Sequence, residues 1–88
     1  MLKNFSKSKL IKVFKEEIKI KGRFNEKSKI YDYKNWDSLA NFNILLSIEK
    51  EFKIKFNSKE FGALNSFSDI LMHVKKKNLY RKKITHSF

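Results

Sequence analysis

The chain has 88 residues and a formal net charge of +12, so it can form one domain with a small hydrophobic core. It contains no cysteine, which excludes disulfide bonds, thiolate metal sites and a cysteine nucleophile. Its first residues are charged without an apolar run behind them, and no stretch approaches the about 20 apolar residues of a membrane helix. We therefore expect a cytoplasmic protein with no stable insertion into a membrane.

The positive charge has two explanations. It could serve binding to nucleic acid or to an anionic membrane surface. However, all bases except Arg23 and Arg81 are lysines, whereas bidentate recognition of phosphates and bases favours arginine. The charge could also be compositional, because the chain is rich in Lys, Asn, Ile and Phe, as an AT-rich genome would encode. We expect no nucleic-acid partner and keep a basic helical module, binding nucleic acid or an anionic membrane, as the alternative interpretation.

The first predicted helix covers residues 8–19. Its apolar positions recur at helical spacing on one face, and they are Leu10, Val13, Phe14 and Ile18. Ser6 or Ser8 can accept hydrogen bonds from the free amides at the helix start, and Gly22 lies where a C-terminal cap is expected.

A predicted loop over residues 23–36 follows, and it is long for a helix–helix connection in so small a domain. Five apolar side chains are expected to pin it to the core: Phe24, Ile30, Tyr31, Tyr33 and Trp36. A long pinned loop that delivers the chain to a helix start makes that start a candidate functional position.

The second predicted helix begins at Asp37–Ser38 and ends near Phe52. Asp37 is the predicted N-cap, and its negative charge suits the positive end of the helix. One apolar stripe along the helix is expected to face the core, and it consists of Ile44, Leu45, Ile48 and Phe52.

The same helix carries a second apolar stripe on nearly the opposite side. It consists of Leu39, Phe42 and Leu46 and is flanked by Asn43, Glu49 and Lys50. One stripe is enough to hold a surface helix to its core, so the second is either buried between helices or a docking surface for something apolar. We favour docking, because this stripe starts next to Ser38.

Two capping boxes are predicted in the remaining chain. Asn57 with Glu60 opens a short helix over residues 58–63, and Ser66 with Asp69 opens the last helix.

The last helix has an apolar face made by Phe67, Ile70, Leu71 and Val74. Its predicted end is at Lys75–Lys77, because bases suit the negative end of a helix. Residues 78–88 are expected to form a basic, flexible tail beyond a single domain over residues 1–77. With no proline in the chain, the sequence predicts an all-α fold, a small four-helix bundle of three longer helices and one short helix.

Residues that support catalysis or metal binding are not clustered in the sequence. Nothing places His73 or His86, the only histidines, beside a serine and a carboxylate, so we expect no Ser-His-Asp site. The acids Glu16–Glu17, Glu49 and Glu51 lie on lysine-rich helices, where ion pairing is expected. We therefore expect neither a metal site nor an enzyme.

Ser38 stands at the positive end of the second helix, where free amides favour a phosphate-type anion. A serine in this place can also be no more than a cap or a first-turn residue. Its surroundings differ in charge from the rest of the chain. Residues 37–53 have a net charge of −1, against +7 for residues 1–36 and +6 for residues 54–88.

The stretch Asp37-Ser38-Leu39, with Trp36 before it, is followed by an apolar helix and by Glu49-Lys50-Glu51-Phe52-Lys53-Ile54. It resembles the acyl carrier protein family, whose pattern is Asp-Ser-Leu, an apolar helix and then Glu-x-x-Phe-x-Ile. The resemblance covers about residues 8–77 and includes the predicted capping box at Asn57–Glu60.

The resemblance implies a non-catalytic carrier modified at Ser38. A separate phosphopantetheinyl transferase would attach 4′-phosphopantetheine from coenzyme A to this serine, with Asp37 and Leu39 supporting the site. The arm would supply the thiol that the cysteine-free chain lacks and hold an acyl or aminoacyl group as a thioester. Partners would be activating ligases, synthases or transferases, and the carrier itself would be a monomer.

The resemblance also implies a partner-docking face made by Leu39, Phe42, Asn43, Leu46, Glu49 and Lys50. A bound acyl chain could enter between the helices, where the candidate lining is Ile44, Leu45, Ile48, Phe52, Ile70 and Val74, all of which are equally core candidates. The typical fatty-acid carrier has several acids along the second helix and a small residue before Asp-Ser-Leu. This chain departs from that pattern at both places, which implies a dedicated carrier with its own partners, in a fatty-acid-like or a specialised biosynthetic pathway.

Overall fold

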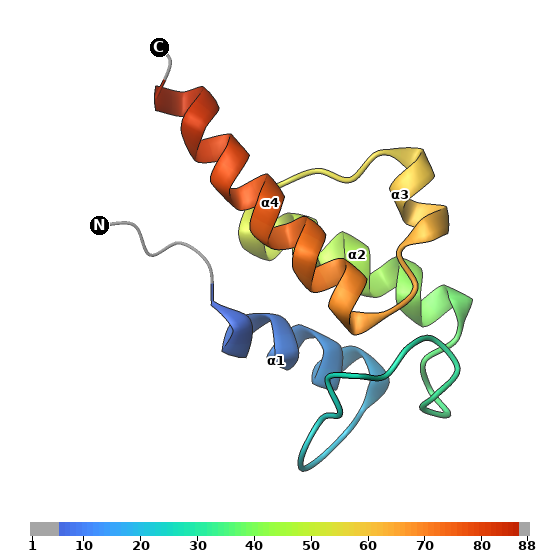
Figure 1. The fold of residues 1–88 in the computed structure, drawn as a ribbon. Helices are drawn as coiled ribbons and strands as arrows, with labels where there is room; N and C mark the ends of the chain where they lie inside the picture. Colours follow the sequence, from blue (N-terminus) through green and yellow to red (C-terminus); the bar gives the residue numbers. More distant parts are fainter. Residues whose placement is uncertain (1–5, 87–88) are drawn as a thin grey trace.

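The computed structural model describes the backbone of residues 6–86 and the side chains of residues 6–78. Within that range the chain forms four helices and no strand (Figure 1). They are α1 (Lys7–Ile18), α2 (Ser38–Phe52), α3 (Ser58–Ala63) and α4 (Phe67–His86). The prediction of an all-α fold with three longer helices and one short helix is confirmed.

The core lies between α1, α2 and α4, and the predicted apolar faces of these helices supply it. Its fully buried helix residues are Leu10, Phe14, Ile18, Ile44, Leu45, Ile48, Phe67, Ile70 and Val74. An aromatic cluster sits at its centre, where the Phe14 ring lies 5.0 Å from the Phe67 ring and 5.3 Å from the Trp36 ring. Each such side chain contributes about 1.5–3 kcal/mol through burial. Burial of these side chains therefore holds the three long helices together.

The N-cap of α1 is Ser6, whose hydroxyl accepts a hydrogen bond from the Lys9 amide at 3.2 Å. Its C-cap is Lys19, in the left-handed conformation with φ 53°. The predicted cap at Gly22 is therefore wrong, and Gly22 uses its positive φ in the following loop instead. The side-chain amide of Asn35 donates to the Ile18 carbonyl at 3.1 Å, which satisfies one of the free carbonyls at the helix end.

The loop between α1 and α2 is pinned to the core as predicted, with one exception. Phe24 and Trp36 are buried, and Ile30 and Tyr33 pack partly against the core. Tyr31 does not pin the loop, because its side chain is 67% exposed. Two backbone hydrogen bonds tie the loop to the start of α4: the Ile30 amide donates to the Asn65 carbonyl, and the Phe67 amide donates to the Ser28 carbonyl.

α3 carries the predicted capping box, in which Asn57 and Glu60 exchange side-chain and backbone hydrogen bonds at 2.8 Å. The Glu60 carboxylate also pairs with Lys77 of α4 at 3.0 Å. Burial alone would raise the pKa of Glu60. The Asn57 amide, the Lys77 ammonium and the nearby His73 together outweigh burial and lower it.

α4 starts where the Ser66 hydroxyl accepts from the Asp69 amide at 3.2 Å. The prediction that the helix ends at Lys77 is wrong, because the helical backbone continues to His86 and extends past the other helices (Figure 1). No glycine or proline follows Gly62, so the chain beyond the lysines lacks the two residue types that most strongly stop a helix, and Asn78 does not stop it. The predicted flexibility of residues 78–88 stays a prediction, and residues 87–88 lie outside the described range.

Among the described residues, none of the helices combines the length and the apolar character that crossing a membrane requires.

Candidate functional site

Asp37 is the N-cap of α2, as predicted. Its backbone is extended, and its carboxylate accepts a hydrogen bond from the Ala40 amide at 2.9 Å. Ser38 is consequently the first helical residue, and its side chain is exposed. The site therefore presents an accessible hydroxyl at the end of the helix that carries the partial positive charge of the helix dipole.

The hydroxyl of Ser38 has a partner that sequence reasoning missed. The Tyr31 phenol oxygen lies 2.9 Å from Ser38 Oγ, and either atom can donate the hydrogen bond. The two residues meet because the loop before α2 folds back beside the first turn of the helix. The irregular loop has no periodicity from which this contact could be predicted.

A buried polar chain supports the site from inside the domain. The fully buried Trp36 indole donates to Asn41 Oδ1 at 2.9 Å, and Asn41 Nδ2 donates to the Leu64 carbonyl at 2.9 Å. These two hydrogen bonds join Trp36, the residue before the N-cap, to α2 and to Leu64, which follows α3. The role of Asn41 was not predicted from the sequence, although a polar residue among the buried positions of α2 was a usable signal.

The second apolar stripe of α2 lies at the surface. Leu39 is 68% exposed, Phe42 46% and Leu46 43%, so the stripe is not buried between helices. The Phe42 ring packs against Phe61 of α3, with 5.0 Å between the ring centroids. An exposed apolar surface thus begins beside Ser38, and Phe42 joins it to the partly buried Phe61 of α3.

The carboxylates of α2 are engaged within the domain. Glu49 accepts a hydrogen bond from the Phe56 amide at 2.8 Å, and Glu51 lies 3.6 Å from the Lys9 ammonium of α1. Asp37 caps the helix. Of the predicted docking residues, Asn43 and Glu49 are half-buried and Lys50 is exposed, so the exposed charge that flanks the stripe is positive.

The predicted acyl-chain lining belongs to the closed core. All six residues are buried: Ile44, Leu45, Ile48, Phe52, Ile70 and Val74.

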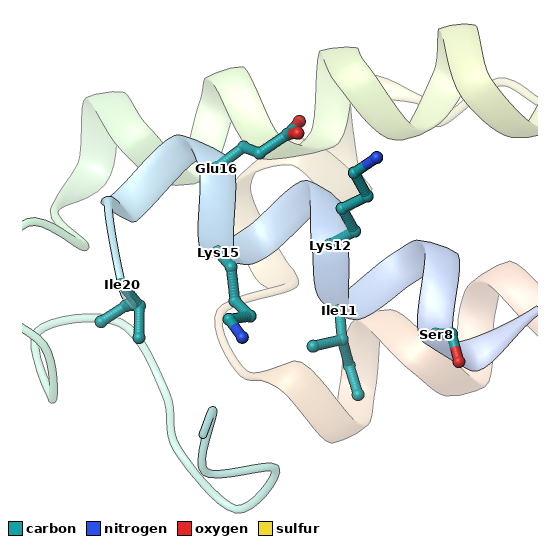
Figure 2. A pocket seen from close by; sticks show the side chains of 6 residues that line it. All are labelled: Ser8, Ile11, Lys12, Lys15, Glu16 and Ile20. Atoms are coloured by element: carbon teal, nitrogen blue, oxygen red, sulfur yellow. The ribbon is translucent and has the colours of Figure 1, made fainter. Parts of the chain in front are cut away.

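Two surface grooves are present, and neither is lined by the six buried residues just named. One, of about 370 Å³, runs along α1 (Figure 2) and is lined by Ser8, Ile11, Lys12, Lys15, Glu16 and Ile20. The other, of about 290 Å³, lies between α1 and α2 and is lined by Val13, Glu16, Glu17, Ser47, Lys50 and Glu51. Neither groove includes Ser38, Tyr31 or the exposed stripe.

Within the part of the chain that the structure describes, no three His, Cys, Asp or Glu side chains gather closely enough to hold a metal ion. His73 Nδ1 lies 3.0 Å from the Asp69 carbonyl within α4. The side chain of His86 lies outside the described residues.

No protein-family model, curated protein or solved structure matches this chain.

Proposed function

We propose that this chain is a carrier protein of the acyl-carrier type. Ser38 carries 4′-phosphopantetheine, and the arm presents an acyl or aminoacyl group as a thioester to partner enzymes. The observation that carries the proposal is an exposed serine at the first position of α2, held by the Asp37 cap and followed by an exposed apolar stripe. The Asp-Ser-Leu and Glu-x-x-Phe-x-Ile pattern and the four-helix order add support.

Attachment of the arm requires little from the carrier itself. The Ser38 oxygen attacks a phosphorus of the coenzyme A diphosphate, a new O–P bond forms, and the bond to the adenosine bisphosphate breaks. The serine proton passes to a base of the transferase. The carrier contributes the oxygen and its presentation, and the positive end of α2 favours the resulting phosphodiester by about 0.3–1 kcal/mol.

The surface around Ser38 restricts the partner. An apolar pocket would receive Leu39, Phe42 and Leu46, while carboxylates on its rim would face Lys50. A partner with a basic rim would bind weakly, because the carboxylates of Glu49 and Glu51 are engaged within the domain. The carrier therefore suits ligases, synthases or transferases of a dedicated pathway.

The test is the intact mass of the chain after incubation with coenzyme A and a broad-specificity phosphopantetheinyl transferase. Wild type is expected to gain the mass of one phosphopantetheine group, and Ser38→Ala to gain nothing. A wild type that stays unmodified, or an S38A variant that is still modified, contradicts the proposal.

The basic helical module remains a second candidate function because of α4. This helix runs to His86, and from residue 75 onward its sequence holds six bases and no acid. A basic helical module would bind duplex DNA or anionic vesicles, and this binding would weaken steeply with salt, since neutralised phosphates release counterions. Absence of such binding at low salt removes this candidate.

A further inference from the structure

The backbone of Tyr31 adopts an unusual conformation. Its φ is +76°, a region that L side chains rarely occupy. The other two non-glycine residues with positive φ in the described chain, Lys19 and Lys53, end α1 and α2. The left-handed conformation is common at such helix ends. Tyr31 ends no helix, so its conformation needs another explanation.

The surrounding loop imposes this conformation. The Tyr31 amide donates to the Trp36 carbonyl at 2.7 Å, which ties it to a fully buried residue. On the other side, the Lys29 amide donates to the Asp32 carboxylate at 2.8 Å, and the Asp32 amide donates to the Lys29 carbonyl at 2.9 Å. Residues 29–36 therefore turn back on themselves and carry Tyr31 with them.

The side chain of Tyr31 does not gain core packing from this arrangement, since it is 67% exposed. Its hydroxyl instead lies 2.9 Å from Ser38 Oγ. Tyr33 of the same loop behaves differently. Its ring stacks on Phe24 with 5.6 Å between centroids, and its hydroxyl accepts from the Asn25 amide at 2.9 Å. Tyr33 holds the loop together, whereas Tyr31 is directed at the serine.

We propose that Tyr31 is a positioning residue for the modification of Ser38, an inference that depends on the proposed function. As a donor, the phenol holds the serine oxygen in one orientation and leaves the serine proton free for the base of the transferase. After transfer, the same O–H donates to an oxygen of the phosphodiester. The loop thus prepares the acceptor oxygen before the transferase arrives.

Tyr31→Phe removes only the hydroxyl, and Tyr33→Phe is the matched control on the same loop. With coenzyme A and a broad-specificity transferase, Y31F is expected to be modified about fivefold more slowly than Y33F, the effect of one lost hydrogen bond. The loss should fall on kcat with KM for the carrier unchanged, because Tyr31 acts on the oxygen and not on docking. In the modified protein, the ³¹P resonance of the phosphodiester should shift in Y31F and stay at the wild-type position in Y33F.

Equal rates for Y31F and Y33F overturn the inference, as does a faster Y31F, a loss confined to KM or an unshifted ³¹P resonance. These results leave the proposed function intact, because wild type is still modified. Failure of wild type to accept the group overturns the proposed function and this inference with it. Thermal melting of both variants verifies that they are folded at the assay temperature.

Discussion

The starts of α2 and α3 share one local arrangement: a buried aromatic residue, an N-cap and an exposed serine at the first helical position. At α2 these residues are Trp36, Asp37 and Ser38, and at α3 they are Phe56, Asn57 and Ser58. In each case the cap side chain accepts from the amide three residues on, at 2.9 Å in α2 and 2.8 Å in α3. The hydrogen bond made by the N-cap side chain therefore does not distinguish the two serines.

Their surroundings do. At α3 the Glu60 carboxylate occupies the helix start, where it accepts from the Asn57 amide and pairs with Lys77. At α2 the equivalent residue is Ala40, so no carboxylate takes that place, and Tyr31 contacts the serine instead. Ser38 is also followed by Leu39 and a helix of 15 residues, whereas Ser58 is followed by Lys59 and a helix of 6. The comparison shows that the environment of the capped serine, and not the cap, makes α2 the candidate attachment site.

The largest expected effect comes from removing the buried aromatic residue beneath α2. Trp36→Ala should lower the free energy of unfolding by about 3–5 kcal/mol, because it removes a fully buried ring from the aromatic cluster and leaves Asn41 Oδ1 without its donor. Denaturant titration measures the change. Leu39→Ala is the control, and it should change stability by less than about 0.5 kcal/mol because Leu39 is exposed. Equal losses in both variants would mean that Trp36 does not anchor the helix.

A smaller effect separates the two caps. Asp37→Ala and Asn57→Ala should each cost about 1 kcal/mol of stability, because each removes one hydrogen bond at a helix start. Only D37A should slow the modification of Ser38, since only that change frays the first turn of α2. Modification rates measured beside denaturant titrations make the comparison. If N57A slows modification as much as D37A does, the rate reports general stability, and the distinction between the two starts fails.

The smallest effect concerns acid stability at α3. The pKa of Glu60 is lower in the folded chain than its ordinary value of 4.5. Its ionised form therefore contributes stability that is fully present above the pKa of the unfolded chain and is lost as pH falls through the pKa of the folded chain. Glu60→Gln should reduce this part of the pH dependence without changing the modification of Ser38. Thermal melts between pH 3 and 7 test the prediction, and an unchanged pH profile would contradict it.

Much of the fold was predictable because periodicity and capping are local. The sequence predicted α2 and α3 at their observed bounds, since Asp37 and Asn57 are favourable caps and the apolar positions repeat regularly. The helix ends were less predictable. Lys19, not Gly22, caps α1, and α4 continues past Lys77 and Asn78, where no glycine or proline follows.

The candidate site was predictable only in part. Ser38, its cap and the exposed stripe follow from the sequence, because all three belong to one helix. The contact with Tyr31 does not follow, since it depends on how an irregular loop returns to the helix. The hydrogen bond from the Phe56 amide to the Glu49 carboxylate was equally unpredictable. The sequence pattern places Glu49 at the surface of α2, and its partner belongs to the irregular segment between α2 and α3.

The central claim is that Ser38, and not another capped serine, carries the arm. The most direct measurement is fragment mass spectrometry of the modified wild type, which locates the added group on one residue. The account predicts the group on Ser38 alone, with Ser58→Ala modified at the wild-type rate and Ser38→Ala not modified. A group found on Ser58, or a wild type that accepts none, would contradict it.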